Sequence, residues 1–380
     1  MLVSVNLSTL CTDCALWLLW SAPRGVARCS LLHRPLVLLQ SVSESAATFR
    51  FVVQSRCDAQ TLRASVSCAD SRLVLFEALD DAAVATLTFE TRADVRVVQC
   101  VALGGAFEFA LRWPDDRPVH ALVLSDAQAN PGVFRRLLRN SRLAALDLVL
   151  FGGDATQHSR AFEWARYAAA YEELAALVPI AHARGNHDHG LEATLFGSPA
   201  PLVAFSFGAA RVLVLDSSFF THPHLHAPTT RAELHAALDA ELVGGAWLNA
   251  SWRVAACHVP RRIGFWEPAA WARGEKLEPE AIDAQLWPRL RDARVDVLIS
   301  GHSHMYSYAT SADSGAAEFI VGGAGGALEV ESERVAAPFA EKELLVHHSA
   351  TLSVSKQRLV WTVHDESDRV IHQVEKLRDQ

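Results

Sequence analysis

Short apolar runs, several of which alternate with polar residues at a two-residue period, fill the first part of the chain. Between residues 35 and 112 we predict strands at six of these runs, residues 48–53, 63–67, 73–76, 84–89, 95–101 and 107–111. A two-residue period is typical of a strand with one buried face. Six short strands without a clear helical stretch predict a small antiparallel β-sandwich.

The pattern changes after the proline-flanked polar segment 113–118, where strand-like runs begin to alternate with helical periods. We predict strands at residues 121–124, 146–151, 179–183, 253–257 and 295–299, and a hairpin at 203–215 that is broken at 208–210. Helices are predicted at residues 133–143, 160–177, 231–242 and 279–294, the last disturbed at Pro288. Strands at 318–321, 350–354, 359–363 and 370–374 follow. This alternation predicts an α/β fold.

These changes divide the chain into three predicted parts. Residues 1–34 are a leader or a poorly ordered segment, residues 35–116 an accessory β-sandwich domain, and residues 117–376 a larger α/β domain. The full length of 380 residues suffices for one large domain or two smaller ones.

Composition and charge narrow the class of protein. Half of the residues are apolar and 21% are charged, which indicates a globular chain. The formal net charge is −8 and no dense run of Lys or Arg occurs, which argues against a nucleic-acid grip. No apolar run reaches the roughly 18 residues of a transmembrane helix, so we expect no membrane-spanning segment.

The N-terminus leaves the compartment open. Residues 15–20 are apolar and are followed by Ser21 and Ala22, as at the end of a signal peptide, but Asp13 interrupts the stretch and no basic residue precedes Arg24. Both a cytoplasmic and a secretory location fit this pattern. Cys57, Cys68 and Cys100 lie in or beside predicted strands, so they are either disulfide partners in an exported chain or buried thiols.

Five polar blocks carry the candidate chemistry, and four of them follow an apolar run. They are Asp126-Ala127-Gln128, Gly153-Asp154, Gly185-Asn186-His187-Asp188, Cys257-His258 and Gly301-His302-Ser303-His304. The carboxyl ends of parallel strands collect the sites of α/β sheets, and glycines allow the backbone to turn sharply there. A single Gly-Asp or an isolated His is most often structural, but that interpretation does not explain five such blocks in order.

Carboxylate, amide and imidazole ligands of this kind suit a pair of divalent ions. Two ions roughly 3.5–4 Å apart clamp a phosphoryl group and ionise a bridging water near neutral pH. Such a pair needs a bridging carboxylate, hard oxygen ligands and several imidazoles. The blocks contain all three.

In their order and residue types, the blocks resemble the pattern of the calcineurin-like metallophosphoesterase family, over residues 119–376. The resemblance implies a four-layer α/β/β/α sandwich, a metallophosphoesterase catalytic domain at 117–376, and two divalent or trivalent ions of Fe, Mn or Zn. The N-terminal sandwich resembles the accessory domain of purple acid phosphatases. The resemblance also implies a role for each residue of the blocks: Asp126, Gln128 and His304 at the first metal, Asp154 as the bridge, Asn186, His258 and His302 at the second metal, His187 as general acid and Asp188 as the group that orients it.

Two positions depart from the family pattern. Gln128 stands where the family usually has His, and an amide oxygen is a weaker donor than imidazole for zinc or iron. Gln157 stands where purple acid phosphatases carry the iron-binding Tyr, so we expect a related but non-purple site. The histidine-rich segment 221–226 either rims the site or forms an exposed loop, and we favour the exposed loop.

The sequence therefore predicts a metal-dependent phosphoric ester hydrolase, a phosphatase or a phosphodiesterase, in which a bridging hydroxide attacks a phosphate-ester substrate. The alternative is a catalytically weak or inactive metal-binding member that acts as a binding or interaction module, and Gln128 is the feature that favours it.

Overall fold

The computed structural model describes residues 36–42, 46–54, 66–69, 71–79, 84–92, 97–102, 105–110, 113, 115–141, 146–174, 177–190, 201–265, 277–334 and 339–378. The predicted leader at 1–34 and Cys57 lie outside these residues. No helix in the described part of the chain is long and apolar enough to cross a membrane.

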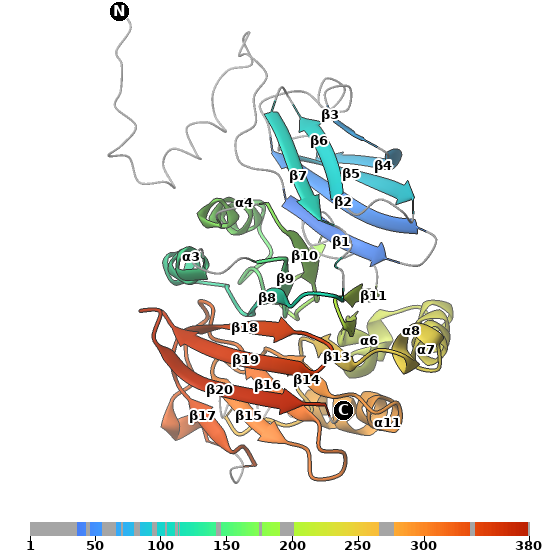
Figure 1. The fold of residues 1–380 in the computed structure, drawn as a ribbon. Helices are drawn as coiled ribbons and strands as arrows, with labels where there is room; N and C mark the ends of the chain where they lie inside the picture. Colours follow the sequence, from blue (N-terminus) through green and yellow to red (C-terminus); the bar gives the residue numbers. More distant parts are fainter. Residues whose placement is uncertain are drawn as a thin grey trace, which may run out of the picture.

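Two sheets stacked face to face form the centre of the molecule, and helices cover their outer faces (Figure 1). The parallel centre of the first sheet consists of β8 (Val119–Leu124), β9 (Leu148–Phe151) and β10 (Pro179–His182). Beside β8 lie the antiparallel strands β18 (His348–Val354), β19 (Arg358–Asp365) and β20 (Val370–Leu377). This meander confirms the three strands predicted near the C-terminus.

The second sheet has seven strands in the order β11-β12-β13-β14-β16-β15-β17. Their bounds are β11 (Leu202–Phe207), β12 (Ala210–Leu215), β13 (Trp252–Cys257), β14 (Val297–Ser300), β15 (Tyr306–Thr310), β16 (Ala317–Val321) and β17 (Lys342–Leu344). The central strands β12, β13, β14 and β16 are parallel. The predicted hairpin is β11 and β12, which are antiparallel.

Alternation along the strands explains the layers. In β8, Ala121 and Val123 belong to the apolar cluster between the two sheets, whereas Leu122 and Leu124 face the helices on the other side. A strand buried on both faces reads as a continuous apolar run, and β8 is buried at every position except His120.

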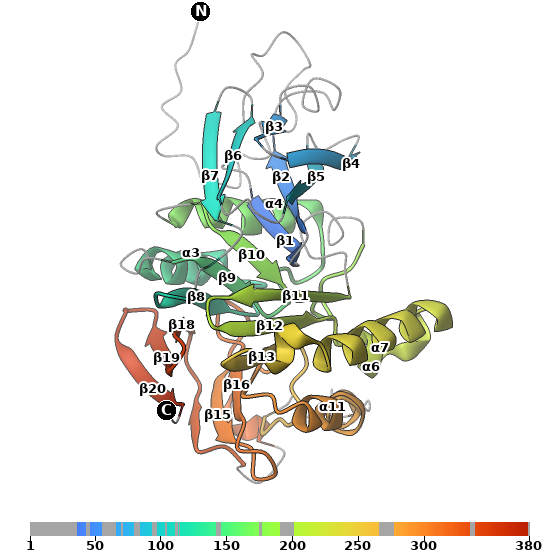
Figure 2. The same ribbon diagram turned by 45° about the vertical axis from the view of Figure 1, so that its right-hand side comes forward.

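The outer helices form the first and fourth layers. On the first sheet lie α3 (Pro131–Asn140) and α4 (Ala161–Ala170), the latter extended by the 3₁₀ turn η3 (Tyr171–Glu173). The second sheet is covered by α6 (Ser218–Thr221), the 3₁₀ turn η4 (Pro223–Leu225), α7 (Pro228–Leu242), α8 (Gly245–Leu248), α10 (Leu277–Ala281), the π-helical turn η5 (Ile282–Leu286) and α11 (Trp287–Asp292). The turn after β16 carries η6 (Glu331–Glu333). Figure 2 shows α3 and α4 across the sheets from α7 and α11.

The N-terminal strands form a small sandwich. One face is β1 (Leu36–Val42), β2 (Ala46–Gln54), β5 (Val84–Arg92) and β4 (Ser71–Leu79), and the other is β3 (Val66–Cys68), β6 (Val97–Ala102) and β7 (Gly105–Ala110). Phe49 of β2 stacks on Phe89 and meets Phe109 of β7 edge to face. A disulfide joins Cys68 to Cys100, which are paired neighbours on β3 and β6. The sequence left this pair open between a disulfide and free thiols.

The sandwich is continuous with the larger sheet. β1 pairs in parallel with β10, through Val37 to Pro179 and Leu38 to Ile180, so that the first sheet has ten strands. Hydrogen bonding therefore runs across the division predicted between residues 116 and 117. The assignment of 35–116 and 117–376 to separate domains stays a prediction.

Two predicted helices differ in detail from the structure. The helix expected at 160–177 ends earlier, where it tightens into η3 and Leu174 turns extended with φ −70° and ψ 145°. The helix expected at 279–294 is divided into α10, η5 and α11, with Pro288 in the first turn of α11. Proline has no N–H for a carbonyl one turn earlier, and the wider π turn before it accommodates that loss.

His182, the last residue of β10, is a buried ionisable group whose ring packs against the first helical layer. Its ring stacks on Phe151 with centroids 4.9 Å apart, and the rings of Trp164 and Tyr167 pack around it. Neither ring nitrogen has a hydrogen-bond partner among the described residues. Burial, which disfavours the charged imidazolium, lowers the pKa of His182 to about 3.

We expect His182 to make the folded protein sensitive to acid. In the unfolded chain its pKa is about 6.5, so its contribution to stability is complete above that pH and is lost as the pH falls toward 3. Between pH 6.5 and 4.5 this loss is about 2–3 kcal/mol in the free energy of unfolding. His182→Phe removes the titration, so urea unfolding at pH 7 and 4.5 should show a smaller acid destabilisation than wild type. The control is His158→Phe, because His158 is exposed. An equal loss of unfolding free energy between pH 7 and 4.5 in wild type and both variants would contradict this account.

Candidate metal centre

The five polar blocks meet at one edge of the two stacked sheets. Asp126, Asp154 and Asn186 follow β8, β9 and β10 of the first sheet, while His258 and His302 follow β13 and β14 of the second. In each sheet these strands are parallel, so their carboxyl ends face the same way. Figure 1 shows β8, β9 and β10 side by side in the first sheet and β13 beside β14 in the second.

Backbone strain is concentrated in these blocks. Seven described non-glycine residues have positive φ, and four of them belong to the predicted ligands: Asp126 (63°), Gln128 (28°), Asp154 (55°) and His302 (70°). A left-handed conformation costs of order 1 kcal/mol or more for a residue with a Cβ, and such costs cluster at functional sites. The strain turns the chain directly after each strand and directs the side chains toward one point.

The first group of ligands centres on Asp126, which is fully buried. The backbone N–H of His302 donates to both of its carboxylate oxygens, at 3.2 and 3.0 Å. Nε2 of His304 lies 3.5 Å from Oδ1 of Asp126. The other ring nitrogen of His304, Nδ1, lies 2.7 Å from the carbonyl oxygen of Ala327, which accepts its proton and leaves Nε2 as the donor atom for a cation.

The second group centres on His258 and Asn186. Oδ1 of Asn186 lies 3.0 Å from Nε2 of His258 and 3.0 Å from Nδ1 of His302. Oδ2 of Asp154 lies 3.3 Å from the same Nε2 of His258. Nδ1 of His258 lies 2.9 Å from the carbonyl oxygen of Gly152, so the proton belongs on Nδ1 and the lone pair on Nε2. Carboxylate oxygen, amide oxygen and imidazole nitrogen thus converge, and this set of atoms could bind a cation.

The electrostatics support this fit. Burial opposes charge on His258, but the charge and hydrogen bond of Asp154 outweigh it and raise the pKa of His258 to about 10. Burial also opposes charge on His304, whereas Asp126 raises the pKa of that imidazole to about 9. For Asp154 burial favours the neutral acid, and the facing His258 outweighs it and lowers the pKa. The two aspartates therefore favour positive charge between them, which a divalent ion supplies. Among the described residues, Asp126, Asp154 and His258 form a buried group that could hold a metal ion.

Comparison with known families matches residues 119–306 to the calcineurin-like phosphoesterase family. These residues belong to the calcineurin-like phosphoesterase family. Among solved structures it is similar to a purple acid phosphatase, PPD1, from yellow lupin (Lupinus luteus) seeds, with 14% identity and a TM-score of 0.67 over 91% of this chain and 74% of the other. It is similar to PhoD, with 11% identity and a TM-score of 0.56 over 92% and 94%. A third is GAP50, the anchor in the inner membrane complex of Plasmodium, with 14% identity and a TM-score of 0.56 over 69% and 90%. None of the curated proteins matches the chain.

Gln128 reaches the same centre through its amide. Its Nε2 donates to Oδ2 of Asp154 at 2.8 Å, so the amide nitrogen faces the predicted bridge and the amide oxygen lies on the other side of the planar group. The proximity agrees with a place beside the first metal. Its role as a ligand stays a prediction.

His187 and Asp188, the predicted general acid and the residue predicted to orient it, have different hydrogen-bond partners. Nδ1 of His187 lies 2.8 Å from the carbonyl oxygen of Gln157. The carboxylate of Asp188 is buried and accepts from the backbone N–H groups of Ala155 and Gly185, at 3.0 and 3.2 Å. These contacts of Asp188 thus fix the loops that carry Asp154 and Asn186, while the Gln157 carbonyl contacts the imidazole of His187. A role of Asp188 in orienting His187 stays a prediction.

The residues of the centre differ in their exposure to solvent. Asp126, Asp154, His258 and His302 are buried at its base, while Asn186 is exposed and Gln128, His187 and His304 are half-buried. The histidine-rich segment belongs in part to this rim. His224 and Leu225 are exposed as expected, but Nε2 of His222 lies 3.3 Å from Oε1 of Glu278, whose other oxygen lies 3.4 Å from Nε2 of His302. Glu278 lies alone at the start of α10, outside every ligand block, so the sequence pattern does not identify it.

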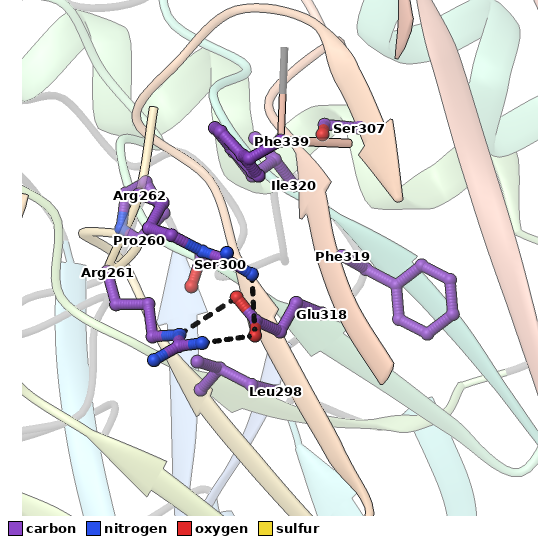
Figure 3. A pocket seen from close by; sticks show the side chains of 10 residues that line it. All are labelled: Pro260, Arg261, Arg262, Leu298, Ser300, Ser307, Glu318, Phe319, Ile320 and Phe339. Atoms are coloured by element: carbon purple, nitrogen blue, oxygen red, sulfur yellow. Dashed lines mark hydrogen bonds and ion pairs between the residues drawn. The ribbon is translucent and has the colours of Figure 1, made fainter. Parts of the chain in front are cut away.

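A buried arginine anchors the segment that follows His258. Arg261 donates from Nε and Nη2 to Glu318 at 3.0 and 2.9 Å, from Nη1 to Asp283 at 2.8 Å, and stacks on Trp287 at 4.0 Å. Figure 3 shows Arg261 and Arg262 both directed at Glu318 in a small pocket. The charges that line this pocket are already paired, so we assign it a structural role.

Three glycines in the blocks leave room for the aspartates. A Cβ on Gly301 would clash with Oγ of Ser125 and Oδ2 of Asp126, and one on Gly185 would clash with Asp154. A Cβ on Gly153 would lie 2.6 Å from Nδ1 of His258. Backbone and ligand therefore approach each other more closely than any other residue type permits.

We expect Gly301→Ala to lower metal content, because Asp126 must move away from the position that the His302 N–H holds. The measurement is the metal-to-protein ratio of the purified variant by elemental analysis. Gly245→Ala, at the start of α8, is the control, because a Cβ there meets only Nδ2 of Asn249 at 3.8 Å. A full metal complement in Gly301→Ala would show that the close approach is not required.

Proposed function

We propose that this protein is a metal-dependent phosphoric ester hydrolase with a centre for two metal ions. The observation that carries the proposal is that two groups of candidate ligands meet around Asp126, Asp154 and His258, which lie close enough together to hold a metal ion. One group contains Asp126 and His304, and the other contains Asn186, His258 and His302. Family membership supports the reaction class, because the family consists of phosphoesterases.

The residues of the two groups define how the ions would be held. Asp126, Gln128 and His304 would bind the first ion, Asn186, His258 and His302 the second, and Asp154 would bridge them. Mixed carboxylate, amide and imidazole ligands suit Fe, Mn or Zn. When bound, such a pair supplies Lewis-acid stabilisation of the phosphoryl oxygens and activates water for attack.

In this proposal His187 is the general acid that would protonate the leaving oxygen. Its backbone N–H donates to Oδ1 of Asp154 at 2.8 Å, which fixes the residue beside the proposed bridge. Because the Gln157 carbonyl engages Nδ1, Nε2 is the atom that would pass a proton to the leaving oxygen. The half-buried ring can exchange that proton with water between turnovers.

The class of substrate is a phosphate ester, with a monoester and a diester both accommodated by this chemistry. Asn186 and His187 lie on the accessible side of the centre, so the ester would approach from there. Assays with an aryl phosphate and an aryl phosphodiester, on protein of known metal content and after reloading with Fe, Mn or Zn, test the proposal. Absence of bound metal and of turnover with every ion would refute it.

The second candidate is a metal-binding member that acts as an interaction module without turnover. Two observations favour it: Gln128 presents an amide where the family pattern has His, and one similar structure is described as an anchor. Two bound ions without hydrolysis of either ester would decide for this candidate.

We expect His187→Ala to lower kcat by about 10²–10⁴-fold while metal content stays near that of wild type. The size is that of a lost general acid, and the side chain of His187 belongs to neither ligand group. Steady-state kinetics with both aryl esters, paired with elemental analysis, measure the two effects separately. Unchanged kcat would remove His187 from the mechanism.

Asp154→Asn should produce the opposite combination, loss of metal together with activity. An amide at the shared position is neutral and a poorer bridge between two cations. The same elemental analysis reports the result, with His187→Ala as the variant of similar location. Retention of two ions per chain would show that Asp154 is not the bridge.

A further inference from the structure

Glu278 connects the metal centre to the histidine-rich segment. It lies in the first turn of α10, and its side chain is only 12% exposed. Oε2 is 3.4 Å from Nε2 of His302, and Oε1 is 3.3 Å from Nε2 of His222. One carboxylate therefore contacts an imidazole in the base of the site and another at its rim.

The contact with His302 falls on the ring atom that faces away from the other ligands. Nδ1 of His302 is directed at Oδ1 of Asn186, at 3.0 Å, so the imidazole is held between an amide oxygen on one side and a carboxylate on the other. A carboxylate at Nε2 favours the tautomer with the proton on Nε2 and the lone pair on Nδ1. That is the tautomer that a metal beside Asn186 needs.

Each of the three histidines has one ring nitrogen that points away from the candidate metal position, and the group that contacts this far nitrogen differs among them. His258 and His304 use the backbone carbonyls of Gly152 and Ala327. At His302 a side chain from a different layer of the fold contacts the far nitrogen. A backbone carbonyl cannot be removed by substitution. The side chain of Glu278 can be, so its contact with His302 can be tested directly.

The contact with His222 ties the rim to the same carboxylate. His222 lies between α6 and η4, and its Nδ1 is 3.0 Å from Oγ1 of Thr221. Both ring nitrogens of His222 therefore have partners, Thr221 and Glu278 of α10. The exposed His224 lies two residues further along the chain. Any displacement of Glu278 would therefore reach the ligand and the rim together.

We propose that Glu278 is a positioning residue for the second metal ion, acting through His302, and that its other oxygen fixes the rim histidine His222. This inference rests on the function proposed above. Its basis is the geometry of one carboxylate between two imidazoles, and it concerns the orientation of the ligand.

The experiment compares Glu278→Ala and Glu278→Gln with Glu280→Gln, an exposed glutamate two residues away that loses the same charge. Calorimetric titration of metal-free protein with Zn²⁺ or Mn²⁺ measures each binding event. We expect Glu278→Ala to weaken one event about 10–100-fold, the size reported for lost outer contacts of a metal ligand. Glu278→Gln keeps one acceptor oxygen and should recover part of the loss, while Glu280→Gln should match wild type.

A double-variant comparison identifies which ion is affected. Asn186→Ala removes a ligand of the second site alone, so adding Glu278→Ala to it should cost less than the sum of the two single losses. Losses of binding free energy that add up in the double variant, or weaker binding of the first ion in Glu278→Ala, would overturn the assignment. His222→Phe removes only the rim contact, and a loss as large as that of Glu278→Ala would place the effect in the loop instead of His302.

A spectroscopic measurement is independent of turnover. In ¹⁵N-histidine-labelled, metal-free protein, the ring shifts of His302 should report the Nε2–H tautomer in wild type and in Glu280→Gln, and a mixture in Glu278→Ala. The same tautomer in every protein, with equal affinities, would overturn the proposal. If wild type binds neither metal, the proposed function has failed, a result distinct from equal binding by wild type and Glu278→Ala.

Discussion

The backbone N–H of His302 donates to both carboxylate oxygens of Asp126, and this contact joins the two sheets where both end. Asp126 belongs to the first sheet and His302 to the second. A second cross-sheet bond, from Nδ1 of His258 to the carbonyl of Gly152, lies beside it. Ligands from different sheets can share a cation only if the sheets are fixed to within a fraction of an ångström. The left-handed turns at Asp126, Asp154 and His302 supply that precision at a cost in backbone strain.

That cost is compatible with a stable fold because three apolar clusters surround the strands. The strands are covered on both faces, by the other sheet on one side and helices on the other, so their ends cannot relax outward. Glycines at 185 and 301 remove Cβ atoms that would clash with Asp154 and Asp126, and Gly153 leaves room for the ring of His258. The packed layers therefore position the proposed ligands. The negative charge of Asp126 and Asp154 favours a cation bound between them.

Much of this arrangement follows from sequence because each ligand block is local. A buried run followed by Asp, Asn or His, with glycine beside it, identifies a strand end without knowledge of its partner. Pairing between distant segments has no such local sign. The parallel pairing of β1 with β10 and the contact of Glu278 with His302 depend on residues far apart in the chain. For the same reason the sequence does not disclose the contact of the Asp188 carboxylate with the backbone of Ala155 across the loop.

The outer helical layer has a part in the site that its apolar pattern does not disclose. Its buried residues, such as Leu286 and Trp287, pack on the second sheet as a helix layer requires. The same layer brings Glu278 to His302 from one side, while Asp283 and Trp287 hold Arg261 from the other. Arg261 follows His258 by three residues, so both histidines that cross from the second sheet are supported by α10, η5 and α11. A shift of that helical segment would displace His258 and His302, two of the three residues proposed to bind the second ion alone, and through the N–H of His302 it would also disturb Asp126.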